Sequence, residues 1–126
     1  MAPLDEFARS QYVSLTTYRR DGTPVATPVW LAVDGGELYT VSLSDAGKVK
    51  RIRNNGRATV TVCNLRGRIA PGAPTADGTA RLLDAAETLD VRRLLRRKYF
   101  LSRLGDWATK IPLVRRPPAT GIAITF

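Results

Sequence analysis

Alternating apolar and polar positions, interrupted by turns that contain glycine and proline, dominate the first two thirds of the chain. Residues 12–18 and 24–33 are rich in β-branched and aromatic side chains, which favour strands. The Asp21-Gly22 pair between them is a strong hairpin signal. A third strand is predicted over residues 37–43, after a turn at 34–36. The pattern therefore predicts an antiparallel β-meander.

In three places the hydrophobic period lengthens to that of a helix. A short helix is predicted over residues 4–10, and a second from about 45 to 54, ended by Asn55-Gly56. The longest helix is predicted from about 86 to 101. Further strands are predicted over residues 57–65, 75–83 and 121–126, and irregular segments over 66–74 and 105–118.

The longest predicted helix has two contrasting faces. Asp84 and Glu87 have the spacing of a capping box at its start. The apolar face carries Val91, Leu94, Leu95 and Tyr99. The cationic face carries Arg92, Arg93, Arg96, Arg97 and Lys98. We interpret the cationic face as exposed, and the lack of interleaved aromatic residues does not favour stacking on nucleic acid.

At least six strands with two or three helices indicate a mainly β fold, and closure of the strands into a barrel would remove exposed edges. The 126 residues, of which 44% are hydrophobic, are enough for one core, so residues 1–126 are expected to form a single domain. No apolar run approaches the length of a membrane span, and the first residues lack the apolar core of a signal peptide. A cytoplasmic protein is therefore expected.

Composition narrows the possible chemistry. The chain has no histidine, which removes Ser-His and Cys-His catalysis and the commonest zinc ligand sets, so no metal site is expected. The single cysteine, Cys63, lies in a predicted strand, where a buried apolar role is favoured over a nucleophilic one. A bound redox cofactor would suit a chain without imidazole. The net charge of +9 favours an anionic partner: nucleic acid, an acidic membrane surface or a polyanionic small molecule.

The start of the second predicted helix is a candidate anion site. Ser44 is predicted as its N-cap, and Lys48 lies in its first turn, where the helix dipole disfavours a cation. Asp45 could offset part of that cost, and a bound phosphate would offset more because free N–H groups at a helix N-terminus bind anions. Two interpretations stay open: a phosphate cradle formed by Ser44, Gly47 and Lys48, or a capped surface helix with solvated lysines.

A second candidate is the run Thr27-Pro28-Val29-Trp30 in the return strand. Proline cannot donate to a β-ladder, so Pro28 marks an edge or a bulge. Backbone groups freed there could pair with the polar edge of a flavin-like ring, and Trp30 could supply a flat apolar wall. The alternative is an edge-strand proline beside a core tryptophan, which taken alone is the better interpretation.

Several motifs follow one another along the chain: Gly22-Thr23-Pro24, Thr27-Pro28-Val29-Trp30, Leu38-Tyr39-Thr40, residues 46–52 (AGKVKRI), and Gly78-Thr79-Ala80-Arg81. In this order they resemble the flavin and deazaflavin oxidoreductases of the split β-barrel superfamily, relatives of pyridoxamine 5′-phosphate oxidase. The nearest resemblance is to the actinobacterial branch that uses the deazaflavin coenzyme F420. It spans roughly residues 7–126 and implies a six- to seven-stranded antiparallel split β-barrel with two or three flanking helices.

The resemblance also implies a homodimer with cofactor sites at the subunit interface. In the family, a basic residue at the start of the helix after the third strand holds the cofactor phosphate, which corresponds here to Lys48 with Ser44 and Gly47 nearby. The ring lies against the second strand. Its contacts would be Thr27, Pro28, Val29 and Trp30, together with Ser42 at the end of the third strand.

Two departures from the family pattern bear on the cofactor and substrate. The flavin-mononucleotide (FMN) oxidases carry a second basic residue just before the cradle lysine, whereas Ala46 and Gly47 stand here. The histidine of the vitamin B6 substrate site is also missing. F420 is therefore favoured over FMN. Its anionic tail could meet five arginines, singly or across the dimer: Arg51, Arg53, Arg57, Arg66 and Arg68. For any one of them a solvated surface charge is the better interpretation, and the loop arginines Arg66 and Arg68 are the preferred pair.

The function that this resemblance implies is hydride transfer from reduced F420 to a small unsaturated organic substrate. The catalytic residues are unknown, because Tyr39 or a water could deliver a proton and no motif selects one. An FMN-dependent oxidoreductase of the same fold is the first alternative. The second is a non-enzymatic basic module that binds a cofactor or nucleic acid.

Overall fold

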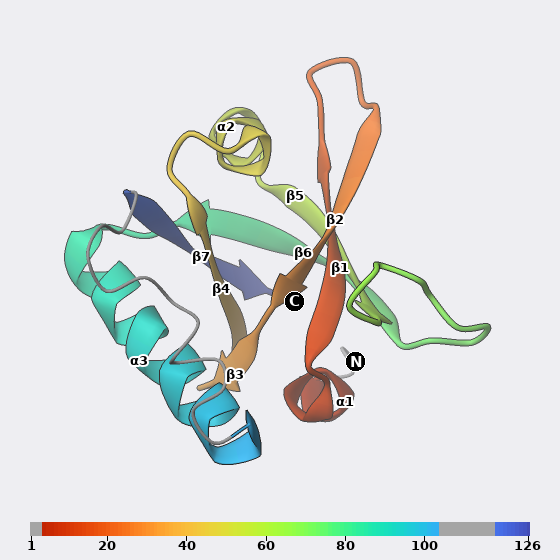
Figure 1. Ribbon diagram of the computed structural model, residues 1–126. Coiled ribbons are helices and arrows are strands. Elements are labelled where there is room, and N and C mark those ends of the chain that lie inside the picture. Colours follow the sequence, from red (N-terminus) through yellow and green to blue (C-terminus); the bar gives the residue numbers. More distant parts are fainter. Residues whose placement is uncertain (1–3, 104–117) are drawn as a thin grey trace.

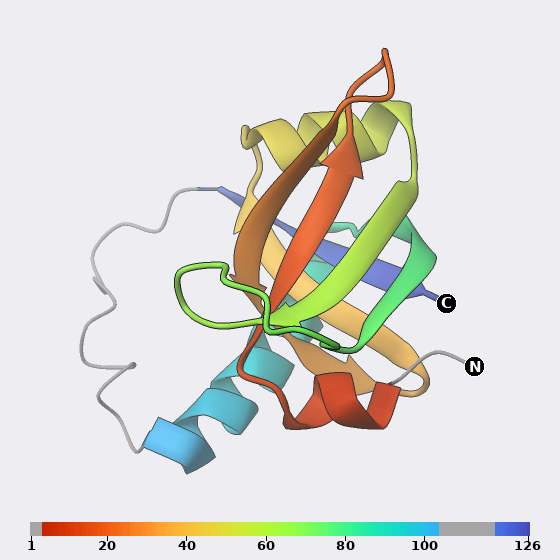
Figure 2. The same cartoon turned by 90° about the vertical axis from the view of Figure 1, so that its right-hand side faces the viewer.

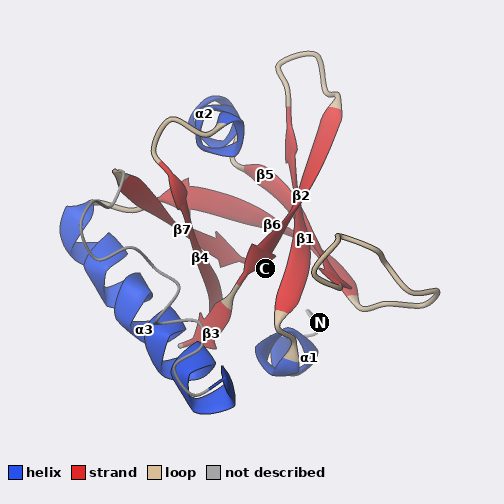
Figure 3. Ribbon diagram, viewed as in Figure 1, coloured by secondary structure: helices blue, strands red, loops and turns tan. Residues whose placement is uncertain are grey.

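The computed structural model describes residues 4–103 and 118–126. Figure 1 shows a strongly curved sheet with a helix at each end and a longer helix along one side, and Figure 3 separates the helices from the strands. The helices are α1 (Leu4–Arg9), α2 (Gly47–Asn54) and α3 (Ala85–Arg103). The strands are β1 (Tyr12–Tyr18), β2 (Pro24–Trp30), β3 (Ala32–Asp34), β4 (Glu37–Leu43), β5 (Arg57–Cys63), β6 (Thr75–Leu82) and β7 (Ala119–Thr125).

The seven strands form one antiparallel sheet in the order β2-β1-β5-β6-β7-β4-β3. The two edge strands, β2 and β3, are consecutive in the sequence and are separated by Leu31 alone. Because one residue joins the opposite edges, the sheet has to curl into a barrel. This confirms the predicted mainly β split barrel with flanking helices, and Figure 2 shows the curvature from the side.

The prediction of one continuous return strand over residues 24–33 is wrong. The strand breaks at Leu31: the part before it pairs with β1, and the part after it pairs with β4. Both parts have β-forming residues, so local propensity does not reveal the change of partner. β2 and β4 do not pair with each other, so the barrel is open between these two strands. We call this opening the seam.

The interior of the barrel holds the main core. Alternate side chains of the strands point inward, among them the fully buried Val13, Val60 and Ile122. The two helices at the ends complete this core: α1 inserts Phe7, and α2 inserts Ile52. The ends of the barrel are therefore closed by apolar side chains from helices.

The long helix α3 covers the outer face of the sheet and forms a second core (Figure 1). Val91, Leu95 and Tyr99 pack against Leu83 and Ala123, as the predicted apolar face requires. The predicted exposure of the whole cationic face is wrong for Lys98, whose amine donates hydrogen bonds to backbone carbonyls. The predicted irregular segment 105–118 lies, apart from its last residue, outside the described residues.

Within the described parts of the chain, no helix combines the length and apolar character needed to cross a membrane. The same residues contain no group of three or more His, Cys, Asp or Glu side chains that could hold a metal ion. Cys63 is partly buried, and burial raises the pKa of its thiol, which disfavours the reactive thiolate.

Candidate functional site

The N-terminus of α2 has no side-chain cap. Its N-cap is Ala46, in an extended conformation (φ −64°, ψ 148°), and the helix begins at Gly47. The prediction that Ser44 caps this helix is wrong. The Ser44 hydroxyl instead lies 2.8 Å from the Thr120 hydroxyl, and its backbone N–H bonds Pro118, so Ser44 ties β4 to β7.

The first turn of α2 leaves donors and a cation exposed to an incoming anion. In the described residues, the N–H groups of Gly47 and Lys48 make no hydrogen bond, whereas the Val49 N–H bonds the Ala46 carbonyl. The first turn contains no acidic residue. Lys48 forms no ion pair with Asp45 or with any other described carboxylate. Asp45 therefore does not offset the Lys48 charge through an ion pair, although the sequence suggested that it could.

A second cation, Arg51, lies beside the same turn. Its Nε donates to the buried Thr17 hydroxyl at 2.6 Å, and a side chain at position 47 would approach the guanidinium to 2.7 Å. Glycine at 47 therefore leaves room for the guanidinium. Burial and the Arg51 charge lower the pKa of Lys48, while burial and the Arg19 charge lower that of Arg51. Lys48 and Arg51 thus lie close together and form no ion pair with a described carboxylate, which is typical of an anion site.

The seam places polar groups inside the barrel. If the β3–β4 pairing continued past Ala32 and Tyr39, Val29 would stand opposite Ser42. Thr27 pairs with the inward-facing Leu15, so Thr27 also faces the interior. Its hydroxyl is buried and has no hydrogen-bond partner among the described residues. A buried unpaired hydroxyl is costly, and a ligand atom in the seam would satisfy it.

Strand alternation divides the four predicted ring contacts between two faces. Thr27 and Val29 face the seam, whereas Pro28 and Trp30 face outward. The Trp30 ring stacks on Tyr99, with centroids 5.2 Å apart. Pro28 lies on an edge strand in unbroken register with β1, which confirms the edge and gives no bulge. The loop glycine Gly67 approaches its outer side.

Arg66 and Arg68 lie on a tightly built loop at the far end of β5 from α2 (Figure 2). The Asn64 side chain accepts hydrogen bonds from both backbone N–H groups at 2.9 Å, and both arginines are exposed. Since seven strand residues span roughly 20 Å, the loop and the Lys48 cradle are separate within one chain. A role for these arginines at the same cofactor requires a second chain or an extended ligand.

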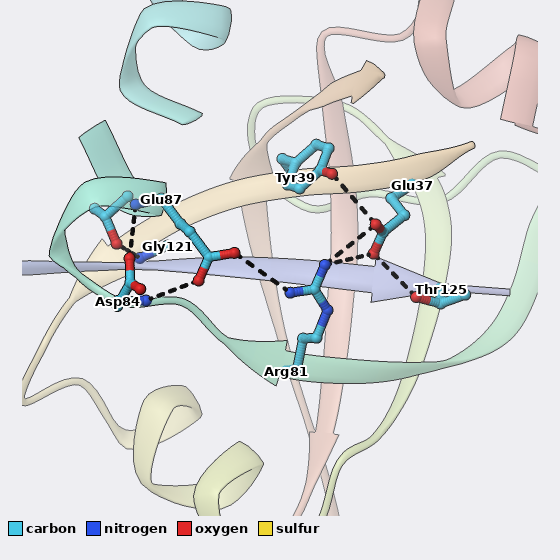
Figure 4. A network of polar contacts seen from close by, with 8 residues as sticks. Glu37, Tyr39, Arg81, Asp84, Glu87, Gly121 and Thr125 are labelled. Atoms are coloured by element: carbon cyan, nitrogen blue, oxygen red, sulfur yellow. Dashed lines mark hydrogen bonds and ion pairs between the residues drawn. The ribbon is translucent and has the colours of Figure 1, made fainter. Parts of the chain in front are cut away.

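A different polar cluster lies on the outer face beneath α3 (Figure 4). Arg81 donates to both carboxylate oxygens of Glu37 at 3.1 Å and lies 3.9 Å from Glu87. Tyr39 donates to Glu37, and burial and the Glu37 charge raise the pKa of its phenol. A pocket of about 220 Å³ opens here. Tyr39 therefore faces α3, on the opposite side of β4 from Thr40 and Ser42.

The α2 turn presents cations and free backbone donors, and the seam presents the polar side chains of Thr27 and Ser42. Lys48, Arg51 and the two free N–H groups can hold a phosphate, while Thr27 and Ser42 can hydrogen-bond a neighbouring ring. The sequence singled out Gly47 and Lys48 for the cradle, but it placed Arg51 among the arginines that could meet the cofactor tail. The four-residue spacing from Gly47 to Arg51, one helical turn, is the signal that could have found it.

These features define a split β-barrel with polar groups along its seam and two cations beside an uncapped helix start. The family model of pyridoxamine 5′-phosphate oxidase matches residues 3–122, and the chain belongs to this family. No curated protein matches the chain.

Solved structures show the same fold at low identity. A conserved hypothetical protein from Mycobacterium tuberculosis is 19% identical with a TM-score of 0.70, covering 99% of this chain and 80% of that one. An FAD-binding protein from Mesorhizobium loti is 21% identical with a TM-score of 0.67, covering 100% and 90%. An F420 reductase is 22% identical with a TM-score of 0.59, covering 96% and 90%. At these identities the likeness establishes the fold alone.

Proposed function

We propose that this protein is an oxidoreductase that binds coenzyme F420 and transfers a hydride from its reduced form to a small unsaturated organic substrate. The observation that carries the proposal is the pair of cations at the uncapped start of α2, Lys48 and Arg51, without a carboxylate partner in the described residues. Membership of the oxidase family and the fold shared with an F420 reductase support it.

The residues present fit a phosphorylated tricyclic cofactor. The phosphate would meet Lys48, Arg51 and the N–H groups of Gly47 and Lys48. The ring would enter the seam, where the unpaired Thr27 hydroxyl and Ser42 supply polar contacts, and Val29 and the rest of the apolar interior exclude water. The bound deazaflavin supplies hydride chemistry, so the protein has to bind, orient and shield.

The choice of F420 over FMN rests on charge and reach. A flavin mononucleotide ends at its phosphate, whereas the F420 tail continues through a phosphodiester to several glutamates. Arg66 and Arg68 are exposed and lie about one strand length from the cradle, so they suit an extended anion or the cofactor of a second subunit. Arg51 weakens the argument against FMN, because it supplies the second cation that position 46 lacks.

A homodimer with cofactor sites at the subunit interface is part of the same proposal, because the loop arginines of one subunit could then reach a cofactor held by the partner. Residues 1–126 would form one cofactor-binding domain. The cytoplasmic location expected from the sequence stays a prediction. Multi-angle light scattering would measure the mass directly, and a monomer that still binds F420 would remove the role of Arg66 and Arg68 across the interface.

The test is a fluorescence titration of the protein with F420 and FMN side by side. We expect tighter binding of F420. Lys48→Ala should weaken it by about 1.5–3 kcal/mol, the usual value of a charged hydrogen bond. Lys50→Ala is the matched control, because Lys50 lies on the same helix, is exposed, and should leave affinity unchanged. Equal affinities of the wild type and Lys48→Ala would reject the cradle.

Two alternatives give different results in the same experiment. An FMN-dependent enzyme would purify yellow and bind FMN at least as tightly as F420. A non-enzymatic basic module would bind neither cofactor and would retain DNA or RNA with strong salt dependence. The net charge of +9 motivates the second alternative.

A further inference from the structure

Leu31 is the single residue at which the barrel opens. Before it, β2 pairs with β1; after it, β3 pairs with β4. The direction in which β2 leaves β4, and hence the width of the seam, is therefore set by the backbone at this residue. Leu31 itself is fully buried and belongs to neither ladder.

Two consecutive side chains of α3 hold this backbone. The Leu31 N–H donates to the Tyr99 hydroxyl at 3.0 Å. The Leu31 carbonyl accepts from the Lys98 amine at 3.0 Å, and the Tyr99 hydroxyl lies at the same distance from it. Both polar groups of the junction are thus satisfied by a helix rather than by a neighbouring strand.

The same two side chains also hold the link from α1 to β1. Lys98 donates to the Ser10 carbonyl at 2.7 Å, and Tyr99 donates to the Gln11 carbonyl at 2.7 Å. A phenol has one proton, so when Tyr99 donates to Gln11 only Lys98 can satisfy the Leu31 carbonyl. The two residues therefore act together and join the first residues of the β1 hairpin to the junction.

The aromatic contacts extend this arrangement into β2. Tyr99 is 1% exposed, and its ring stacks on Trp30, the last residue of β2, at a 28° interplanar angle. The Lys98 amine also lies 5.4 Å from the centroid of the Tyr99 ring. Burial lowers the pKa of Lys98 to about 8, so the amine is mostly protonated at neutral pH.

The geometry points to Lys98 and Tyr99 as positioning residues that fix the opening of the seam, and so the fit of the cofactor ring, from outside the barrel. This inference rests on the proposed binding of the ring in the seam. Neither residue touches the cradle at α2, so the ring and the phosphate should respond differently when the pair is altered.

The test compares two ligands in Lys98→Met, which keeps the aliphatic stem and removes the ammonium. We expect F420 affinity to fall by about tenfold, the lower end of the effect of losing a charged hydrogen bond. Inorganic pyrophosphate, which reaches only the α2 cradle, should bind as in the wild type. Lys98→Arg should restore F420 affinity, and Arg97→Met, an exposed neighbour on α3, should change neither affinity.

Amide hydrogen exchange of the ligand-free protein separates this inference from the proposed function. In Lys98→Met, and in Tyr99→Phe should the first variant fail to fold, the amides of residues 25–31 and 40–43 should exchange faster, while those of the β5–β6 ladder remain unchanged. Unchanged seam exchange would overturn the inference even if F420 binds. Faster exchange of the seam amides in a protein that binds no F420 would support the positioning role of Lys98 and Tyr99 and would reject the proposed function instead.

Discussion

The N-termini of α2 and α3 both carry backbone N–H groups without a partner inside the helix, but only α3 has a side-chain cap. At α3, the Glu87 N–H donates to the Asp84 side chain at 2.8 Å, and Glu87 reaches back to the Asp84 N–H at 3.4 Å. At α2, Ala46 provides no side-chain cap, the first turn has no acid, and two cations lie beside it. A side chain therefore accepts a hydrogen bond from the first turn of α3, whereas no side chain caps the first turn of α2.

The surrounding charges follow the same division. Arg81, next to the start of α3, is paired with Glu37 and approaches Glu87 (Figure 4). Lys48 and Arg51 at the start of α2 have no carboxylate partner among the described residues. Sites arranged for stability have their polar groups paired within the chain, whereas a ligand site holds them unpaired at some cost. This difference is the reason we propose the α2 terminus as the ligand-binding one.

Gly47→Ala should give the largest separation between affinity and stability. The new methyl would meet the Arg51 guanidinium at 2.7 Å and displace it from the cradle. We expect cofactor affinity to fall by about 1.5–3 kcal/mol, as for loss of a charged hydrogen bond. Alanine is the better helix former by up to about 1 kcal/mol, so the midpoint of thermal unfolding should not fall.

A double-mutant cycle supplies the control for that substitution. In an Arg51→Ala background, Gly47→Ala should have no further effect on affinity, because the group it displaces is already absent. Additive losses of affinity would mean instead that glycine is needed at position 47 so that the backbone itself can approach the ligand.

Ala46→Asp would make α2 resemble α3. Ala46 already has the extended conformation of an N-cap, so an aspartate there should stabilise the free protein by about 1 kcal/mol. Its carboxylate would occupy the N–H groups and pair with Lys48, so cofactor affinity should fall. Urea unfolding and the fluorescence titration measure the two effects, and a rise in both stability and affinity would contradict the proposed use of this terminus.

The same comparison shows what the sequence could predict. The capping box of α3 was predictable, because Asp84 and Glu87 carry a local signal at fixed spacing. The roles of Gly47 and Lys48 stay predictions; the signal behind them is that a glycine and a lysine in a first turn conflict with the ordinary preferences of a helix. Most strands were predictable from alternation alone, with boundaries that differ by a residue or two.

The failures concern contacts between distant segments. Ser44 has the composition of a cap, but its hydroxyl finds Thr120, 76 positions away. Lys98 lies on the same helix face as exposed arginines, yet its amine turns inward, because it donates hydrogen bonds to the carbonyls of Leu31 and Ser10. The break at Leu31 has no local signal, since it follows from which strands pair. Such features depend on tertiary closure, which periodicity does not encode.

Asp84→Ala should affect stability alone. Loss of the α3 cap should destabilise the protein by about 1 kcal/mol, the typical value for an N-cap aspartate. Cofactor affinity should stay at the wild-type value, because this terminus lies on the outer face of the sheet, away from the seam. A matched loss of affinity would show that α3 is coupled to the cofactor site through its start as well as through Lys98 and Tyr99.

The smallest expected effect is the pH dependence of cofactor binding. The pKa of Lys48 is lowered in the free protein by burial and by the Arg51 charge, and a bound anion should raise it again. Binding therefore takes up a proton once the pH exceeds the lowered value, so affinity should decline with rising pH between that value and about 10.5. Stability of the free protein has the opposite sign, because a lowered pKa in the folded state favours folding as the pH rises through this window.

Lys48→Arg is the control for this titration, since a guanidinium keeps its charge throughout. Affinity in the variant should be nearly independent of pH over the same range, and calorimetry in buffers of different ionisation enthalpy should find no proton uptake. Proton uptake that persists in Lys48→Arg would show that another group titrates on binding. The contribution of the Lys48 charge would then be judged from the affinity of Lys48→Ala alone.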